Sequence, residues 1–128
     1  MKKLEQEIKQ YLDERLWNNL RPGDLAKSIS IEAAELLEVF QWSNPELAQV
    51  KVNQEKIDAI KKELADVLIY CLETSVLLGF DTESIIREKL DYSKKKYPAE
   101  IMAQAKGKES GTEDIYWKIK KEHRKHHA

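Results

Sequence analysis

The sequence predicts an all-α protein: a bundle of four main helices with a short basic helix or tail at its C-terminal end. Apolar residues recur at helical spacing through most of the chain, which is the pattern of helices that pack through one face. Only 4 glycines and 3 prolines occur among 128 residues, too few for the turns of a β fold. A chain of this length with 41% hydrophobic and 35% charged residues fits one soluble helical domain.

The first two helices are marked by an apolar stripe and by the turn that separates them. The stripe of the first helix, expected over residues 2–19, consists of Leu4, Ile8, Tyr11, Leu12 and Leu16. The segment RPGD at residues 21–24 supplies the turn residues that end it. A second helix is expected over residues 24–42.

A third main helix is expected from the cap at Asn53 to about Gly79. The segment SNPE at residues 43–46 ends the second helix and starts a short connecting segment. Asn53 can accept a hydrogen bond from the first turn, and Gly79 tolerates the left-handed conformation that often ends a helix. Within this helix, LADVLIYCL at residues 64–72 is apolar on almost every side, so we expect it to be buried.

A fourth main helix is expected between a cap at Asp81 or Thr82 and Pro98. We divide the chain after Pro98, into a helical catalytic domain over residues 1–98 and a basic C-terminal extension over residues 99–128. The extension begins with AEIMAQAKGKESG, which looks loosely ordered, and TEDIYWKIKKEHRKHHA is expected to form a final helix.

Composition narrows the range of partners. The net charge of −1 argues against a nucleic-acid binder, and no apolar run approaches the ~20 residues needed to span a membrane. The charged start, MKKLEQEIKQYL, does not resemble an export signal. Cys71 is the single cysteine, which excludes an intrachain disulfide and a multi-cysteine metal site. We therefore expect a cytoplasmic protein.

Two pairs of carboxylates stand at positions where apolar residues are expected. Glu32 falls in the middle of the apolar stripe of the second helix, and Glu35 follows it three residues later. Glu63 and Asp66 have the same spacing on the third helix, in its most apolar part. A buried, unpaired carboxylate is costly, so four that converge between two helices need cations among them.

The identity of those cations follows from the neighbouring residue types. Salt bridges are the rival explanation, but residues 28–42 and 63–86 contain no lysine or arginine. The spacing of three residues between two acids is by itself weak evidence for a metal site, since Glu55 and Asp58 share it. No histidine precedes His123, which disfavours di-iron and zinc chemistry. Oxygen-only ligands favour Mg²⁺, with Mn²⁺ as a substitute, and a substrate rich in oxygen anions such as a phosphate ester.

The sequences around these acids resemble those of the MazG-like all-α nucleoside triphosphate pyrophosphohydrolases, and most closely the small dCTP-pyrophosphatase-like branch. The resemblance lies in EAAELLE from Glu32, which continues into VFQW, and in ELAD from Glu63, which continues into VLIY. It extends from Trp17 to Pro98 and includes RPGDLAKS and KKYP. It implies a four-helix bundle of the all-α NTP pyrophosphatase type.

The resemblance also implies an activity, which is the hydrolysis of a (deoxy)nucleoside triphosphate between its α and β phosphates with Mg²⁺. The monophosphate and pyrophosphate are the products, and dCTP is one candidate substrate. The implied metal ligands are Glu32, Glu35, Glu63 and Asp66. Glu35 and Glu38 are the two candidates for the catalytic residue that accepts the proton from water.

Further residues are implied to bind the substrate. Those expected to contact the base are Trp17, Trp42 and Tyr70. Those expected to contact the phosphates are Lys89, Ser93, Lys96 and Tyr97. Ser93 replaces the asparagine of the family pattern, and WNNLRPGD lacks the histidine that relatives carry after the tryptophan. Base preference is therefore left open.

The helices also indicate self-association. The second and third helices offer more apolar surface than one short chain can cover, and the family forms dimers or tetramers, so we expect a homodimer or homotetramer. Two other functions remain open: a pyrophosphohydrolase of the phosphoribosyl-ATP type, and a non-catalytic helical oligomerisation or interaction module.

Overall fold

The protein is helical throughout the described part of the chain, which comprises residues 1–105 and 111–127 of a computed structural model. Within those residues there is no strand, so the predicted all-α class is confirmed. The helices are α1 (Lys2–Glu14), α2 (Pro22–Glu38), α3 (Leu47–Lys51), α4 (Gln54–Leu77), α5 (Thr82–Lys96), α6 (Ala99–Ala105) and α7 (Gly111–His127). None of these described helices is both long enough and apolar enough to cross a bilayer.

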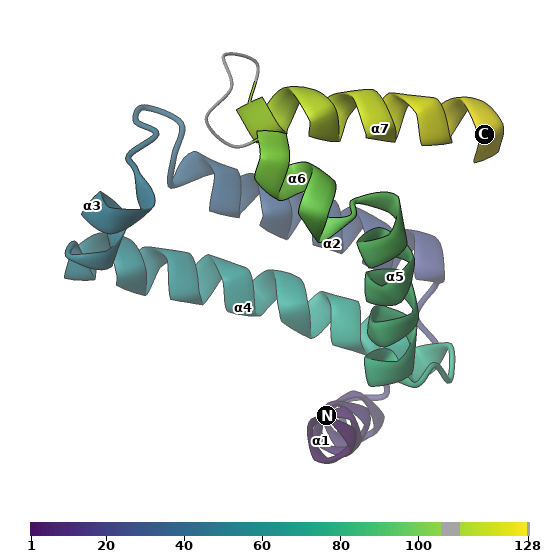
Figure 1. Ribbon diagram of the computed structural model, residues 1–128. Helices are drawn as coiled ribbons and strands as arrows, with labels where there is room; N and C mark the ends of the chain where they lie inside the picture. Colours follow the sequence, from purple (N-terminus) through teal and green to yellow (C-terminus); the bar gives the residue numbers. More distant parts are fainter. Residues whose placement is uncertain (106–110, 128) are drawn as a thin grey trace. The chain divides into compact units, whose positions relative to one another are not determined.

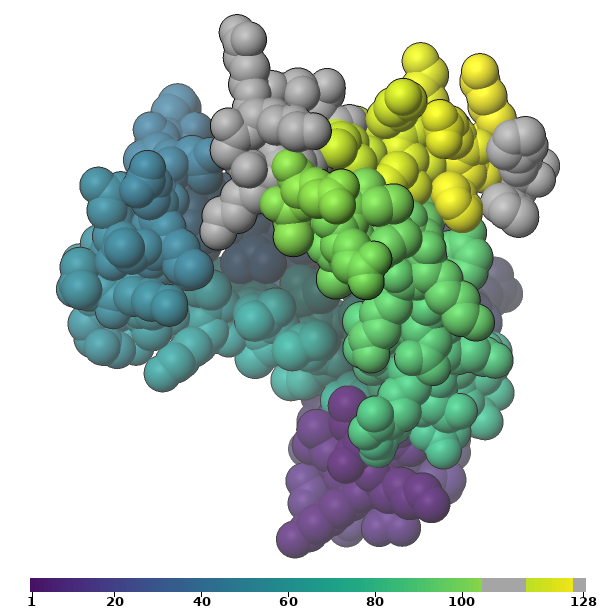
Figure 2. Space-filling model, in the orientation of Figure 1, coloured from purple at the N-terminus to yellow at the C-terminus, as the bar shows by residue number. Residues whose placement is uncertain are grey.

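The chain forms two compact units, Met1–Thr82 and Glu83–Ala128. In the first unit α2 and α4 lie side by side and run in opposite directions, and they form its most extensive helix pair (Figure 1). The short helix α3 packs beside the start of α4 (Figure 2). The division of the chain after Pro98 into a catalytic domain and an extension stays a prediction.

The buried core of the first unit lies where α1 crosses the C-terminal half of α4 (Figure 1). It consists of Ile8 and Leu12 from α1 and Leu72 from α4, and Val76 and Leu77 pack against it. Of the apolar stripe expected on the first helix, Ile8 and Leu12 pack on α4, whereas Leu4, Tyr11 and Leu16 are exposed.

One face of α4 lies outside this core. Leu64, Leu68 and Ile69 are exposed, and Leu68 retains 51% of its accessible surface. The expectation that residues 64–72 are buried on all sides is thus wrong for a single chain, because α1 and α2 cover only part of the helix circumference. An uncovered apolar face of this kind is typical of a contact between subunits.

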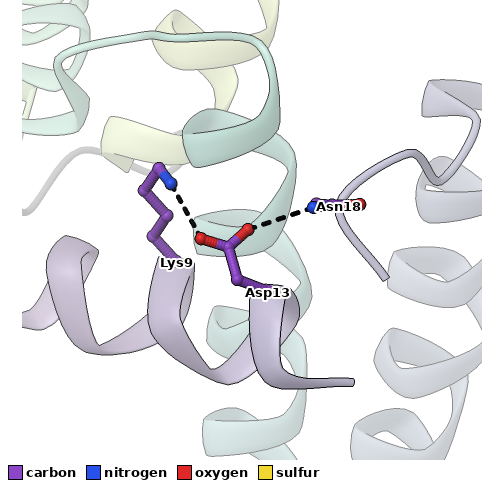
Figure 3. Close-up of polar contacts among 3 residues, drawn as sticks. All are labelled: Lys9, Asp13 and Asn18. Atoms are coloured by element: carbon purple, nitrogen blue, oxygen red, sulfur yellow. Dashed lines mark hydrogen bonds and ion pairs between the residues drawn. The ribbon is translucent and has the colours of Figure 1, made fainter. Parts of the chain in front are cut away.

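The first helix ends at Glu14, five residues earlier than expected, in a bonded turn. The Trp17 N–H donates to the Leu12 carbonyl over 2.9 Å, and the Leu16 N–H donates to the Asp13 carbonyl over 3.1 Å. This pair of bonds is the Schellman motif, which requires a left-handed residue after the cap. Leu16 occupies that position with φ 58°, although glycine usually does. The side-chain amide of Asn18 also donates to Asp13, which an ion pair with Lys9 holds in place (Figure 3).

The helix α4 ends in the same motif with the usual residue. Gly79 has φ 73°, and the Phe80 N–H donates to the Ser75 carbonyl over 2.9 Å. At the other end the Asn53 side chain accepts from the Lys56 N–H over 3.1 Å. Both ends that we assigned to this helix from the sequence are therefore confirmed.

The helix α2 ends at Glu38 rather than at Trp42. Beyond it the N–H groups of Val39 and Phe40 bond three residues back, which tightens the chain out of the α-helical path. The Lys56 ammonium then donates to the Val39 carbonyl over 2.7 Å and so satisfies a carbonyl at the helix end with a positive charge.

The second unit contains α6 and α7, which pack on each other, and most of α5. Residues 99–105 form a helix, so the expectation that the start of the extension is loosely ordered is wrong for them. The remainder of that segment, at 106–110, lies outside the described residues. The final helix is present as α7, and the rings of Tyr97 and Tyr116 stack with centroids 4.9 Å apart.

Leu16 and Gly79 offer a matched test of helix termination. Replacing Leu16 by glycine should raise the free energy of unfolding by about 0.5–1 kcal/mol, because glycine relieves the left-handed strain and the Leu16 side chain is 85% exposed. In the reverse change, Gly79→Leu, the added Cβ meets no atom within 4 Å, so we expect a cost of about 1–2 kcal/mol from the left-handed backbone. Urea denaturation measures both, and a loss of stability in Leu16→Gly would contradict the assignment.

Candidate metal centre

The structure brings together the four carboxylates that the sequence singled out. Glu32 and Glu35 lie one turn apart on α2, and Glu63 and Asp66 lie one turn apart on α4. One carboxylate oxygen from each residue lies within 4.8 Å of the corresponding oxygens of the other three. The convergence follows from the opposite directions of the two helices, which place the middle of α2 against the middle of α4 (Figure 1). Their role as metal ligands stays a prediction.

The carboxylates of this cluster form no ion pair among the described residues, although the charge of Lys62 acts on Glu63. None of the ion pairs found in residues 1–105 and 111–127 involves them. Glu32 Oε2 and Glu63 Oε2 are moreover buried without any hydrogen-bond partner. Buried acceptors of this kind cost free energy unless a ligand satisfies them.

The cluster changes the acidity of its own members. A hydrogen bond with Glu32 and then the charge of that residue raise the pKa of Glu35. Burial is the first cause that raises the pKa of Glu63, and the charge of Glu35 is the second. Mutual repulsion and burial thus raise the pKa values of Glu35 and Glu63, although the charge of Lys62 partly opposes the rise at Glu63.

The donor set fits a small divalent cation. Two oxygens that bind one Mg²⁺ ion lie about 3–4 Å apart, given Mg–O distances of about 2.1 Å. The spread within 4.8 Å is close to that range, and the two unpartnered oxygens point to a missing positive charge. All the donors are carboxylate oxygens, which suit Mg²⁺ and Mn²⁺ better than zinc or iron.

Glu38 lies at the last turn of α2, exposed and outside the group of four. Its charge nevertheless contributes to the raised pKa of Glu35, so the two side chains are close enough to interact. Of the two candidates for the proton acceptor, Glu35 therefore lies inside the cluster and Glu38 lies at its edge.

The aromatic residues predicted to contact the base lie in different places. Tyr70 stands one turn beyond Asp66 on α4, and its pKa is raised by burial and then by the charges of nearby acids, including Glu32. Trp17 and Tyr70 line one pocket. Trp42 lies in a bend after α2 and is 90% exposed, so the expectation that it continues the helix toward the cluster is wrong.

The residues predicted to contact phosphates belong to the second compact unit. The Lys89 ammonium lies 4.6 Å from the ring centroid of Tyr92, and the Lys96 ammonium lies 5.2 Å from that of Tyr97. Ser93 is half-buried on α5. These contacts are internal to the second unit, and a role of Lys89, Ser93, Lys96 and Tyr97 in substrate binding stays a prediction.

The pocket that contains Trp17 and Tyr70 also contains a residue that the sequence analysis overlooked. Glu73 lines this pocket with a side chain that is only 4% exposed. It follows Asp66 by seven residues, or two helical turns, in a stretch without lysine or arginine. The same criterion that identified the other acids, a carboxylate in an apolar helix segment, would have found it.

The chain matches a family model and a solved structure of a known protein. A family model described as the MazG-like family matches residues 27–115. The structure is also similar to the crystal structure of a pyrophosphatase from Archaeoglobus fulgidus, with a TM-score of 0.65 and 34% sequence identity over 77% of this chain and 92% of that one. No match was found among proteins with curated functions.

The raised pKa values predict how the stability of the metal-free protein depends on pH. Because Glu35, Glu63 and Glu73 have raised pKa values, the folded state binds more protons than the unfolded state above the ordinary glutamate pKa of 4.5. The free energy of unfolding should therefore fall as the pH rises from about 4.5 to 7 in the presence of a chelator. Thermal unfolding across this range measures the slope.

Added Mg²⁺ should reverse this effect, because a cation satisfies the ionised carboxylates. The Tm should rise with Mg²⁺ at neutral pH and much less near pH 4.5, where protons compete. A double Glu35→Gln and Glu63→Gln variant serves as the control: it should flatten the dependence on Mg²⁺ and reduce the dependence on pH to the contribution of Glu73. A metal-free Tm that rises toward neutral pH would mean that the cluster is not repulsive.

Proposed function

The chain belongs to the MazG-like family, and from this membership and its converging carboxylates we propose that it is a Mg²⁺-dependent nucleotide pyrophosphohydrolase. In this proposal it hydrolyses a (deoxy)nucleoside triphosphate between the α and β phosphates and releases the monophosphate and pyrophosphate. The observation that carries the proposal is the meeting of Glu32, Glu35, Glu63 and Asp66 without a cationic partner among the described residues. The similar pyrophosphatase from Archaeoglobus fulgidus supports the same class of reaction.

The carboxylate cluster supplies what a triphosphate requires. A triphosphate carries several negative charges, which the four acids alone would repel. These acids would hold Mg²⁺, which would supply the positive charge that neutralises the phosphates and would increase the acidity of the attacking water. The two helices fix the position of that charge, because each contributes a pair of carboxylates from one rigid turn.

Proton transfer falls to Glu35 or Glu38. The attacking water must lose a proton to a nearby carboxylate. Glu35 lies within the cluster, close to the carboxylate oxygens of Glu32, Glu63 and Asp66. Glu38 is exposed one turn later on α2, where it can pass a proton to solvent.

The remainder of the substrate would lie against other residues of the chain. Trp17 and Tyr70 supply aromatic surface for the base, and stacking on such residues contributes about 1–3 kcal/mol per base. Lys89, Ser93, Lys96 and Tyr97 are the residues we propose for the outer phosphates, together with Trp42 for the base. Such a substrate and the single thiol of Cys71 fit a reducing cytoplasm.

We propose that the protein works as a homodimer or homotetramer. Its described residues bury few large apolar side chains and expose many, including Leu37, Leu68 and Trp42. Closed assemblies of identical subunits are the common way to cover such a surface. An exposed residue such as Trp42 could then reach a site that it does not approach within its own chain.

Removing one ligand of the proposed cation should abolish turnover without unfolding the protein. We expect Glu63→Gln and Asp66→Asn to lower the rate of pyrophosphate release by about 100-fold or more, because each deletes a charge that holds the cation. Both should keep the helical signal, since the lost group is a source of repulsion in the metal-free protein. The assay measures pyrophosphate and monophosphate from a panel of (d)NTPs with Mg²⁺.

Glu55→Gln is the matched control, because Glu55 lies exposed in the first turn of the same helix. It should retain full activity. If Glu63→Gln and Asp66→Asn unfold instead, the acids are structural partners and the enzymatic proposal loses its support. Release of inorganic phosphate in place of pyrophosphate would contradict the proposal that the enzyme cleaves between the α and β phosphates.

The uncovered face of α4 should form a subunit contact. Leu68→Glu places a charge on this face and should shift the protein toward the monomer in sedimentation at micromolar concentration. Ile101→Glu, the same change at an exposed apolar residue of α6, should leave the assembly unchanged. A wild-type protein that is already monomeric would contradict the proposal.

A further inference from the structure

A pocket of about 250 Å³ lies in the first compact unit, on the side of the carboxylate cluster toward the C-terminal end of α4. Its apolar lining includes Trp17, Leu20 and Tyr70, and its acidic groups are Asp24 and Glu73. This volume lies below the range of about 300–1,000 Å³ that holds a whole drug-sized ligand. The pocket therefore fits one part of a larger ligand, such as a single planar ring.

Glu73 is the unusual member of this lining. Its side chain is 4% exposed, and no residue in the described part of the chain gives it a hydrogen bond or an ion pair. Burial raises its pKa, which reflects the cost of keeping a charge there. A buried acid that opens only into a pocket is costly for the empty protein and is satisfied by a ligand with a suitable donor.

The pocket and the carboxylate cluster lie along the same face of α4. Asp66, Tyr70 and Glu73 follow one another at spacings of four and three residues, which places them on one stripe of the helix. The rise from Asp66 to Glu73 is about 10 Å. The charges of Glu73, Glu32 and Asp66 all contribute to the raised pKa of Tyr70, so this residue lies between the two sites.

The opposite wall of the pocket is fixed in place by the end of α1. The Schellman turn orients Trp17, whose ring meets Tyr11 edge to face with centroids 5.9 Å apart. The bond from Asn18 to Asp13 restrains the segment that follows (Figure 3). Trp17 retains 46% of its accessible surface, so it offers aromatic surface to a planar ligand.

We propose that Glu73 determines base specificity: it accepts a hydrogen bond from the exocyclic amino group of a nucleobase that lies between Trp17 and Tyr70. The inference rests on the proposed function, since it takes the ligand of the pocket to be the base of the nucleotide whose phosphates lie at the carboxylate cluster. The rise of about 10 Å along α4 is comparable to the length of a nucleoside.

The chemistry of the carboxyl group selects amino bases over their oxo counterparts. A carboxyl oxygen accepts a hydrogen bond from an amino group whether or not the acid is ionised. An oxo group in the same place presents a second acceptor, which an ionised carboxylate can only repel. Cytosine carries an amino group at the position where uracil carries an oxo group. Adenine and hypoxanthine form a second pair with the same difference.

The experiment compares matched substrates in matched variants. In the wild type, kcat/KM for dCTP should exceed kcat/KM for dUTP by about tenfold or more. The value of kcat/KM for dATP should likewise exceed that for dITP. In Glu73→Leu both ratios should fall to within about threefold of one. Glu73→Gln should also lower both ratios, because the side-chain amide can accept a hydrogen bond from an amino group or donate one to an oxo group. Glu55→Leu, an exposed acid of the same helix, should leave the ratios unchanged.

A binding measurement separates this inference from the proposed activity. Deoxycytidine and deoxyuridine are offered to the metal-free protein, and saturation transfer from the protein to each nucleoside is recorded by NMR. The wild type should favour deoxycytidine, and Glu73→Leu should lose the preference. Circular dichroism of each variant checks that it is folded, and Glu73→Gln keeps the size of the side chain.

The outcomes are distinct. If triphosphates are hydrolysed but the amino-to-oxo ratios do not change in Glu73→Leu, the role of Glu73 is overturned and the proposed function stands. If no triphosphate is hydrolysed but the nucleoside preference depends on Glu73, the activity is wrong and the base pocket stands. If neither nucleoside binds and the ratios do not change, Glu73 is a buried acid of the fold alone.

Discussion

The repulsion among four acids between two antiparallel helices is the constraint on which the remaining structure depends. Glu32 and Glu35 face Glu63 and Asp66, and no lysine or arginine of the described residues pairs with them. The α2–α4 pair must therefore be held together against this repulsion by packing elsewhere. The packing of α2 on α4 outside the cluster and the bond from Lys56 to the end of α2 supply part of that support.

The fold was predictable from the sequence where one local signal decides it. Asn53 and Gly79 mark the ends of α4. Asparagine is a residue type that caps the start of a helix, and glycine is one that adopts the left-handed conformation at a helix end. The end of α1 was not predictable in the same way, since Leu16 adopts a conformation that glycine normally takes. The end of α2 depends on Lys56, which lies 17 residues further along the chain. Tertiary contacts of this kind leave no local pattern.

The same contrast holds for the site. The four carboxylates could be identified because each interrupts an apolar stripe in a region without basic residues. Glu73 satisfies that criterion, but it was overlooked because no second acid lies three residues before or after it. Trp42 was misplaced because its expected position relied on a helix that ends four residues earlier. Helical periodicity also gives no information about which residues of separate helices lie close together, so it could not place Lys89, Ser93, Lys96 and Tyr97 relative to the four acids.

The bond from Lys56 to the Val39 carbonyl has a consequence for ion selectivity. It joins the C-terminal end of α2 to the first turn of α4, about two turns from Glu63 and one turn from Glu35. Discrimination between small and large divalent ions depends on how far the ligand-bearing elements can separate. In the metal centre we propose, a bond at this point would limit their separation and so disfavour an ion as large as Ca²⁺. Lys56 would then affect the choice of metal without touching it.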